Sequence, residues 1–317
     1  MEKGIMVSII CCAYNQEKYI EDALKGFVKQ KTSFAYEVLI SDDASTDRTA
    51  DIIRKYEKEY PDIIKPLYLT ENQYSKGIYP GTLLFPKAKG KYIALCEGDD
   101  YWISNDKLQK QFDALEAHPE CDMCAHKALM VRASDQKTIG IIEPMKEEGI
   151  LTMDNVIIGG GNFIATNSLF YREKLEREPA RFVAKYYIDY TIQMQGAMRG
   201  GIYYLNETMS AYRRGADGSW TLYMEKNQDI MIQHLLSMME MLDMVNEDTE
   251  FKYKDSIAVA KKKYEFQLAA YKRDAKVIFG KRYSDLRKEL TLKKKMILFL
   301  KCYAPWTLSV WQRRTGQ

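Results

Sequence analysis

Three carboxylates, Glu97, Asp99 and Asp100, crowd around a single glycine directly after the apolar run at 92–96. The run predicts a short buried strand that ends in this acidic turn. Carboxylates so close together repel one another, and burying them is costly unless a positive charge lies among them. A divalent cation carrying a diphosphate meets that need, because Mg²⁺ is often bound by one or two carboxylates together with phosphate oxygens. The alternative is a solvated acidic turn without a ligand.

Two earlier strands are expected to end in polar residues of the same kind. The segment 6–15 is apolar and β-branched before it ends at Asn15, and the segment 36–43 ends in Asp42 and Asp43. Apolar residues at helical spacing follow each strand. Alternating strands and helices predict a parallel sheet with helices on its faces. Because such sheets bind ligands beyond the carboxyl ends of their strands, we expect the three ends to form one site.

In order and spacing, these segments resemble a family 2 glycosyltransferase with the GT-A fold, of the inverting type that builds bacterial cell-surface polysaccharides. The matching segments are 7–15, 41–49, 96–102 and 107–111. The resemblance implies an α/β fold with a mostly parallel central sheet and flanking helices, and a catalytic domain over 1–220. Leu and Met at helical spacing within 234–242 predict a helical C-terminal region over 221–317.

The resemblance assigns the nucleoside part of the donor to the first two strand ends. Ala13, Tyr14 and Asn15 are expected to contact the nucleobase and ribose, and Asp43 to accept the uracil imide N–H. Asp42 is the weaker candidate of its pair, because side chains alternate along a strand. Two alternatives stay open: Tyr14 as a core aromatic residue, and either aspartate as a cap of the following helix.

For the diphosphate, the resemblance implies a Mn²⁺ or Mg²⁺ ion bound directly by Asp100, with Asp99 on the ribose or on the ion through water. Glu97 is expected to have a supporting role beside Asp99 and Asp100. Arg213 or Arg214, in a stretch that resembles the family's Tyr-Arg segment, is expected to pair with the diphosphate. Many relatives carry a histidine just after that segment and this chain has none there, so the third metal ligand stays open.

The segment 186–195 resembles the acidic motif at a helix start whose carboxylate deprotonates the acceptor, and Asp189 is the candidate base. Partial desolvation beside Tyr187 and Tyr190 would raise its pKa toward useful basicity. The alternative is an ordinary cap of the helix. The polar run 166–168 is expected to lie on a strand that faces the site.

The C-terminal region is strongly basic. From residue 281 onward there are ten Lys or Arg against two Asp or Glu, in a chain with a net charge of +3. Together with Tyr303, Trp306 and Trp311, this composition favours a segment in the headgroup region of an anionic membrane. A helix packed on the body with a solvated basic face is the alternative. No nucleic-acid-binding motif accompanies the basic patch.

The expected cellular location of the protein depends on whether the sequence contains a signal peptide or a membrane-spanning segment. The N-terminus enters the first strand without a signal peptide, and no stretch reaches about 18 uninterrupted apolar residues. We therefore expect a cytoplasmic protein, peripheral on the inner face of the cell membrane.

The sequence as a whole favours an inverting, metal-dependent transferase. It would move a sugar from a nucleotide sugar, a UDP-sugar above all, to a hydroxyl of a lipid-linked or surface-glycan acceptor. Two alternatives remain: a metal-dependent nucleotidyl or phosphoryl transferase, and a nucleotide-sugar-binding scaffold without turnover. The first of these expects a triphosphate site, and the chain has no Gly-x-x-x-x-Gly-Lys loop.

Overall fold

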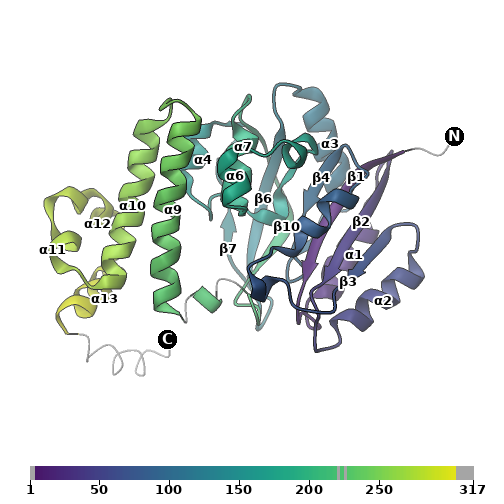
Figure 1. Cartoon of the computed structure of the whole chain (residues 1–317), viewed down its shortest axis with the longest axis horizontal. Coiled ribbons are helices and arrows are strands. Elements are labelled where there is room, and N and C mark those ends of the chain that lie inside the picture. Colours follow the sequence, from purple (N-terminus) through teal and green to yellow (C-terminus); the bar gives the residue numbers. More distant parts are fainter. Residues whose placement is uncertain (1–3, 220–221, 225–226, 305–317) are drawn as a thin grey trace. The chain divides into compact units, whose positions relative to one another are not determined.

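The computed structural model describes residues 4–219, 222–224 and 227–304. The chain divides into two compact units, Met1–Tyr223 and Met224–Gln317 (Figure 1). Trp306 and Trp311 of the predicted membrane segment lie outside the described residues. None of the described helices is long and apolar enough to cross a bilayer.

The first unit is built on a ten-stranded sheet with the order β3-β2-β1-β4-β9-β6-β10-β5, in which β7 also pairs with β6 and β8 with β10. The strands are β1 (Ile5–Ala13), β2 (Ala35–Asp42), β3 (Ile64–Tyr68), β4 (Tyr92–Leu95), β5 (Tyr101–Trp102), β6 (Met123–Arg132), β7 (Thr138–Ile142), β8 (Gly149–Leu151), β9 (Phe170–Arg172) and β10 (Ile202–Arg214). The strands β3, β2, β1 and β4 are parallel, as are β6 and β10. The other pairings are antiparallel, so the sheet is parallel across its first four strands and mixed beyond them.

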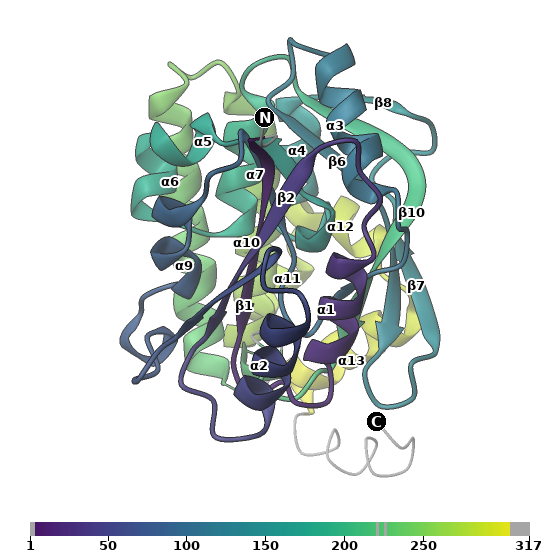
Figure 2. The ribbon, with the colours of Figure 1, turned by 90° about the vertical axis from the view of Figure 1, so that its right-hand side faces the viewer.

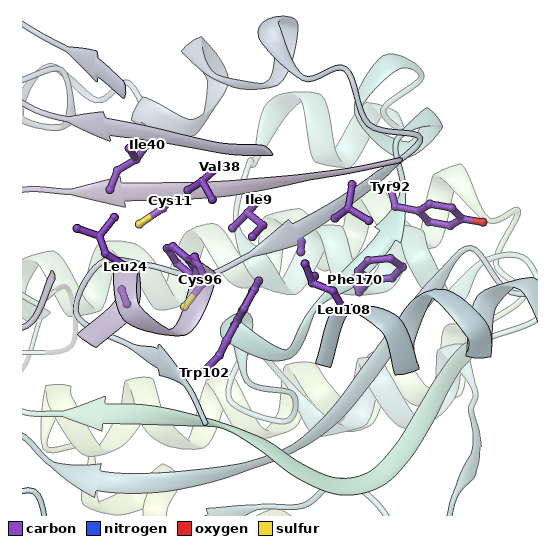
Figure 3. Close-up of a cluster of buried hydrophobic side chains, with 14 of the residues drawn as sticks. Ile9, Cys11, Leu24, Val38, Ile40, Tyr92, Cys96, Trp102, Leu108 and Phe170 are labelled. Atoms are coloured by element: carbon purple, nitrogen blue, oxygen red, sulfur yellow. The ribbon is translucent and has the colours of Figure 1, made fainter. Parts of the chain in front are cut away.

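Burial on both faces explains the apolar sequence of the parallel strands. In β1, every residue from Val7 to Ala13 is buried, which is typical of strands covered by helices on both sides. Figure 3 shows Leu24 of α1 (Ile20–Val28) in the same buried cluster as Ile9 and Val38. Burying one such side chain stabilises the fold by about 1.5–3 kcal/mol.

The remaining helices described in the first unit are α2 (Thr49–Glu59), α3 (Lys107–Ala117), α4 (Met153–Gly159), α5 (Lys174–Arg177), α6 (Arg181–Lys185) and α7 (Asp189–Ala197). The strands β1 and β2 lie side by side, and each leads into its helix, α1 or α2 (Figure 2). The predicted alternation of strand and helix is confirmed here. Between β3 and β4 the chain forms only 3₁₀ turns, at Tyr74–Lys76, Pro80–Leu83 and Phe85–Lys87.

The second unit is helical, as predicted. Its helices are α9 (Gln228–Asp248), α10 (Lys254–Lys272), α11 (Ala275–Phe279), α12 (Ser284–Glu289) and α13 (Leu292–Tyr303). The long helices α9 and α10 pack against each other, and α9 buries Leu235, Met238 and Leu242. The methionine stripe of the sequence is therefore packing surface. A smaller cluster around Phe266, Ile278 and Leu298 joins α10, α11 and α13.

Candidate active site

The carboxyl ends of β1, β2 and β4 meet at one edge of the sheet. The Asp43 N–H donates to Ala13 O at 2.9 Å, and the Gly98 N–H donates to Cys12 O at 3.0 Å. The approach is so close that a Cβ on Gly98 would lie 3.2 Å from the Ala13 Cβ. Strand ends from three separate parts of the sequence thus form one surface.

The turn after β1 is shaped by Asn15. Its backbone has a φ of 51°, a left-handed conformation that Asn adopts more readily than most residues. Its Oδ1 accepts the Thr46 N–H at 2.8 Å, and its own N–H donates to Ser45 Oγ at 2.9 Å. Tyr14 is 39% exposed. It is therefore not a core aromatic residue, and its ring is accessible.

The two aspartates at the end of β2 have different surroundings. Both carboxylate oxygens of Asp43 accept backbone N–H groups, from Gln73 at 2.7 Å and from Tyr74 at 3.0 Å. Asp43 therefore fixes the loop after β3, and it does not cap α2, which begins at Thr49. Asp42 is buried as well. Burial raises its pKa, and its Oδ1 has no hydrogen-bond partner among the described residues.

Burial dominates the electrostatics of the acidic turn. It raises the pKa of Glu97 to about 7 and the pKa of Asp99 to about 6, and it raises the pKa of Asp100 well above its usual value. A bound cation would reverse these shifts, because it favours the ionised carboxylates. No group of three His, Cys, Asp or Glu side chains in the described part of the chain could hold a metal ion by itself. A cation here would therefore share its ligands with a diphosphate and water.

Asp100 is fastened inside the protein, whereas Asp99 is not. Asp100 Oδ2 accepts from Asn167 Nδ2 at 2.9 Å, and Asp100 Oδ1 accepts the Arg213 N–H at 2.7 Å. The Asp99 side chain is half-buried and makes no hydrogen bond to another described residue. This arrangement favours Asp99 as the direct cation ligand and Asp100 as the residue that fixes the turn, the reverse of the division expected from the resemblance.

The Arg213 side chain is turned inward and is 2% exposed. Its guanidinium donates to Asp99 O at 2.8 Å and to Gln136 Oε1 at 3.1 Å, and it pairs with Asp22. It also lies over the Tyr101 ring, 4.4 Å from the centroid. The expected diphosphate contact would require these interactions to break, so the geometry favours a bracing role. The neighbouring Arg214 is exposed.

Asp189 is the first residue of α7, and the cap position belongs to Ile188. Asp189 Oδ2 accepts from the Thr166 hydroxyl at 2.8 Å, and Oδ1 accepts the Tyr190 N–H at 2.7 Å. Burial raises the pKa of Asp189, while these two hydrogen bonds act against the shift. A carboxylate held in one orientation with a raised pKa is suited to accept a proton.

Glu97 connects the acidic turn to the Asp189 segment. Its Oε1 accepts from the Tyr79 hydroxyl at 2.9 Å, and the Tyr79 ring stacks on Tyr187 with 5.6 Å between centroids. Glu97 and Asp189 are close enough that the charge of Asp189 contributes to the raised pKa of Glu97. Tyr79 could not be predicted as a site residue from the sequence, because it lies in an irregular stretch between β3 and β4.

The run Thr166–Ser168 was expected on a strand, and this expectation is wrong: the residues form a 3₁₀ turn. The Ser168 hydroxyl donates to Ala165 O at 2.6 Å, and the Ser168 N–H donates to the same oxygen at 2.9 Å. Such local side-chain bonds compete with strand pairing. Thr166 and Asn167 contact two of the predicted site residues, Asp189 and Asp100, and their place beside the ligand stays a prediction.

Comparisons with known proteins bear on the family and the fold of the chain. A family model described as glycosyl transferase family 2 matches residues 8–178. An uncharacterised protein of Mycobacterium tuberculosis is 39% identical over 216 residues, which cover 68% of this chain and 60% of that protein. The match therefore spans less than two thirds of that relative's length.

Two solved structures are similar in fold. Residues 1–349 of TarS from Staphylococcus aureus match with a TM-score of 0.60 and 18% identity, over 94% of this chain and 79% of that one; the same fragment has been crystallised with UDP-GlcNAc. The mannosyltransferase PcManGT from Pyrobaculum calidifontis, solved with GDP-Man and Mn²⁺, matches with a TM-score of 0.53 and 17% identity, over 95% and 83% of the two chains. The predicted GT-A fold is thereby confirmed.

Proposed function

The chain belongs to glycosyl transferase family 2 and is a glycosyltransferase, and we propose that it moves a sugar from a UDP-sugar to a hydroxyl group with inversion at the anomeric carbon. The proposal rests on one observation. Asp189 and the acidic turn are joined by two adjacent residues, because Thr166 contacts Asp189 and Asn167 contacts Asp100. Inversion requires a base and a leaving group on opposite sides of the transferred sugar, and the contacts through Thr166 and Asn167 bring a candidate base and a candidate diphosphate site close together.

The acidic turn fits a divalent cation. Asp99 would be the direct ligand, with Asp100 and Glu97 adding negative charge behind it. Burial raises the pKa values of these three carboxylates, and the Arg213 guanidinium only partly offsets the shift for Asp99 and Asp100. Mn²⁺ or Mg²⁺ bound there would neutralise the charge that develops on the leaving diphosphate. Arg214, whose side chain is exposed, is proposed to pair with the same diphosphate.

The proton of the acceptor hydroxyl goes to Asp189. As the hydroxyl oxygen attacks the anomeric carbon from the side opposite the diphosphate, the bond to the diphosphate oxygen breaks and UDP leaves. Burial raises the pKa of Asp189, so it is a stronger base than an exposed aspartate. Thr166 and the Tyr190 N–H keep its carboxylate in one orientation.

The uridine would lie on the ends of β1 and β2. Tyr14 has an accessible ring, and backbone groups from Ala13 to Asn15 can hydrogen-bond a base edge. Asp43 already accepts two backbone N–H groups, but its two oxygens have further lone pairs for the uracil N–H.

Release of UDP from a panel of UDP-sugars, with Mn²⁺ and candidate acceptors, tests this function. We expect Asp189→Asn to lower kcat by about 10²–10⁴-fold while UDP still binds, and Asp99→Asn to weaken UDP–Mn²⁺ binding as well. The exposed Asp62 provides the control variant Asp62→Asn. Pyrophosphate release from a nucleoside triphosphate would indicate a nucleotidyl transferase instead, and UDP binding without turnover would indicate a scaffold.

The acceptor is proposed to be a lipid-linked or surface-glycan intermediate, reached from the cytoplasmic face of the membrane. Helix α13 supports this location. Its apolar residues Leu292, Met296, Phe299 and Tyr303 recur at helical spacing and are 45–85% exposed. Lys293 and Lys295 lie between Leu292 and Met296 in the sequence, which at helical periodicity sets them on either side of this stripe. An apolar face between lysines is suited to lie in the headgroup region of an anionic bilayer.

A further inference from the structure

Two adjacent residues hold the two carboxylates on which transfer depends. The Thr166 hydroxyl donates to Asp189 Oδ2 at 2.8 Å, and Asn167 Nδ2 donates to Asp100 Oδ2 at 2.9 Å. We infer that the turn they form sets the separation and orientation of the base and the acidic turn, and that Thr166 and Asn167 are positioning residues for transfer. The inference rests on the proposed function.

The amide of Asn167 has only one workable orientation. Its Nδ2 lies 2.9 Å from the Asp100 carboxylate and 3.0 Å from Ala211 O, and both of these are acceptors. Its Oδ1 accepts from the Ser210 hydroxyl at 2.6 Å. Asn167 is fully buried, so bulk water does not compete for these partners. Since an amide flip would set oxygen against oxygen at two places, Asn167 holds Asp100 in a defined position.

The turn at 166–168 is held by β5 and α3, the strand and the helix that follow the acidic turn in the sequence. Trp102 Nε1 donates to Asn167 O at 3.0 Å, and Gln111 Nε2 donates to Ser168 O at 2.8 Å. Lys107 joins the two anchors, because its Nζ donates to Gln111 Oε1 at 2.7 Å and lies 3.9 Å from the Trp102 ring centroid.

The contacts of Gln111 and Lys107 suggest a role for the segment 107–111, which the proposed reaction does not use directly. The segment 107–111 matched the family pattern without any expected contact to substrate. Lys107 and Gln111 are fully buried, and they act through the turn at 166–168 rather than on a ligand. The acidic turn thus carries the proposed ligand site. The helix after it, α3, supports the turn at 166–168, which contacts the proposed base Asp189.

Thr166 also affects how readily Asp189 accepts a proton. Its hydrogen bond favours the ionised carboxylate and so lowers the pKa of Asp189, while burial raises it. Among the described residues, Glu97 also lies near enough to Asp189 for their charges to interact. Removing the hydroxyl would raise the pKa of Asp189 and leave the carboxylate held by the Tyr190 N–H alone among the described residues.

The isosteric variant Thr166→Val tests the first contact, with Thr166→Ser as the conservative rescue. We expect Thr166→Val to lower kcat by about 10–100-fold, as for loss of a hydrogen bond to a charged group. The acid limb of its kcat–pH profile should move to higher pH, and KM for the UDP-sugar should stay the same. Thr166→Ser should restore both kcat and the profile. Thr138→Val, at an exposed position on β7, is the matched control.

The second contact is tested by binding. Asn167→Asp and Asn167→Ala should weaken UDP–Mn²⁺ binding, measured by titration calorimetry, while unaltered circular dichroism shows that the variants fold. A wild-type kcat–pH profile for Thr166→Val, or wild-type UDP–Mn²⁺ affinity for a folded Asn167 variant, would overturn the inference. A wild-type protein without transfer activity would refute the proposed function instead, and the calorimetric comparison would still decide the role of Asn167.

Discussion

The contrast between Asp99 and Asp100 yields a prediction with two independent readouts. Asp100 accepts one hydrogen bond on each oxygen, from Asn167 Nδ2 and from the Arg213 N–H, in a site that is 2% exposed. The variant Asp100→Asn has only one acceptor oxygen, so its NH₂ group must face one of the two donors. Leaving a buried donor unsatisfied costs about 1–3 kcal/mol.

The expected change in thermal stability follows from the size of the first unit. For a domain of about 150–250 residues, 1 kcal/mol corresponds to roughly 2–4 °C in Tm, so Asp100→Asn should lower Tm by about 2–12 °C. Asp99→Asn removes a charge that raises the pKa of Asp100 and loses no hydrogen bond to another described residue. Its Tm should equal or exceed that of the wild type.

Scanning calorimetry without nucleotide or metal separates the two variants, and calorimetric titration with UDP and Mn²⁺ then compares their binding. Asp99→Asn should bind UDP–Mn²⁺ far more weakly although it is stable. Equal losses of Tm in both variants would refute the proposed division of roles, as would an Asp99→Asn protein that binds UDP–Mn²⁺ like the wild type.

Three further predictions concern packing, pH and the membrane. Gly98→Ala would set a Cβ in overlap with Gln16 Oε1, 2.8 Å from Ile20 Cδ1 and 3.2 Å from the Ala13 Cβ, and this overpacking should cost about 1–3 kcal/mol in a urea unfolding titration; unchanged stability would contradict the close packing of the acidic turn against the end of β1 and the segment after it. Burial lowers the pKa of Lys107 to about 7, so unfolding takes up a proton between that value and about 10.4, the value for an unfolded chain. Wild-type stability should therefore rise relative to Lys107→Met between about pH 7 and pH 9, and parallel stability curves would count against it. Phe299→Ser should reduce co-sedimentation with phosphatidylglycerol vesicles while Ile141→Ser, an equally exposed position on β7, does not; equal binding to neutral vesicles, or dimerisation through α13, would argue against the membrane surface.

The parts of the site that lie on strand ends could be predicted from the sequence. The apolar runs leading to Asn15, Asp43 and Asp99 specify buried parallel strands, and neighbouring parallel strands necessarily end at the same edge of a sheet. The direction of the pKa shift of Asp189 could also be predicted, because burial of a carboxylate always acts in that direction.

Interactions between distant segments could not be predicted in this way. The sequence alone predicts that Arg213 is available to bind a diphosphate. In the structure it is engaged by Asp22 and Asp99, which lie 191 and 114 residues away in the sequence. The Asn167–Asp100 bond spans 67 residues, and no periodicity indicates which of two adjacent aspartates faces inward at the end of a turn. The turn at 166–168 depends on local hydrogen bonds that only the folded chain reveals.

A crystal structure of this chain with UDP and Mn²⁺ tests the central claim most directly. We predict a cation bound between Asp99 and the diphosphate, uracil beside Tyr14 and Asp43, and an open space for the sugar that ends at the Asp189 carboxylate. A nucleotide bound away from the ends of β1, β2 and β4, or a diphosphate far from Asp99, would contradict the account.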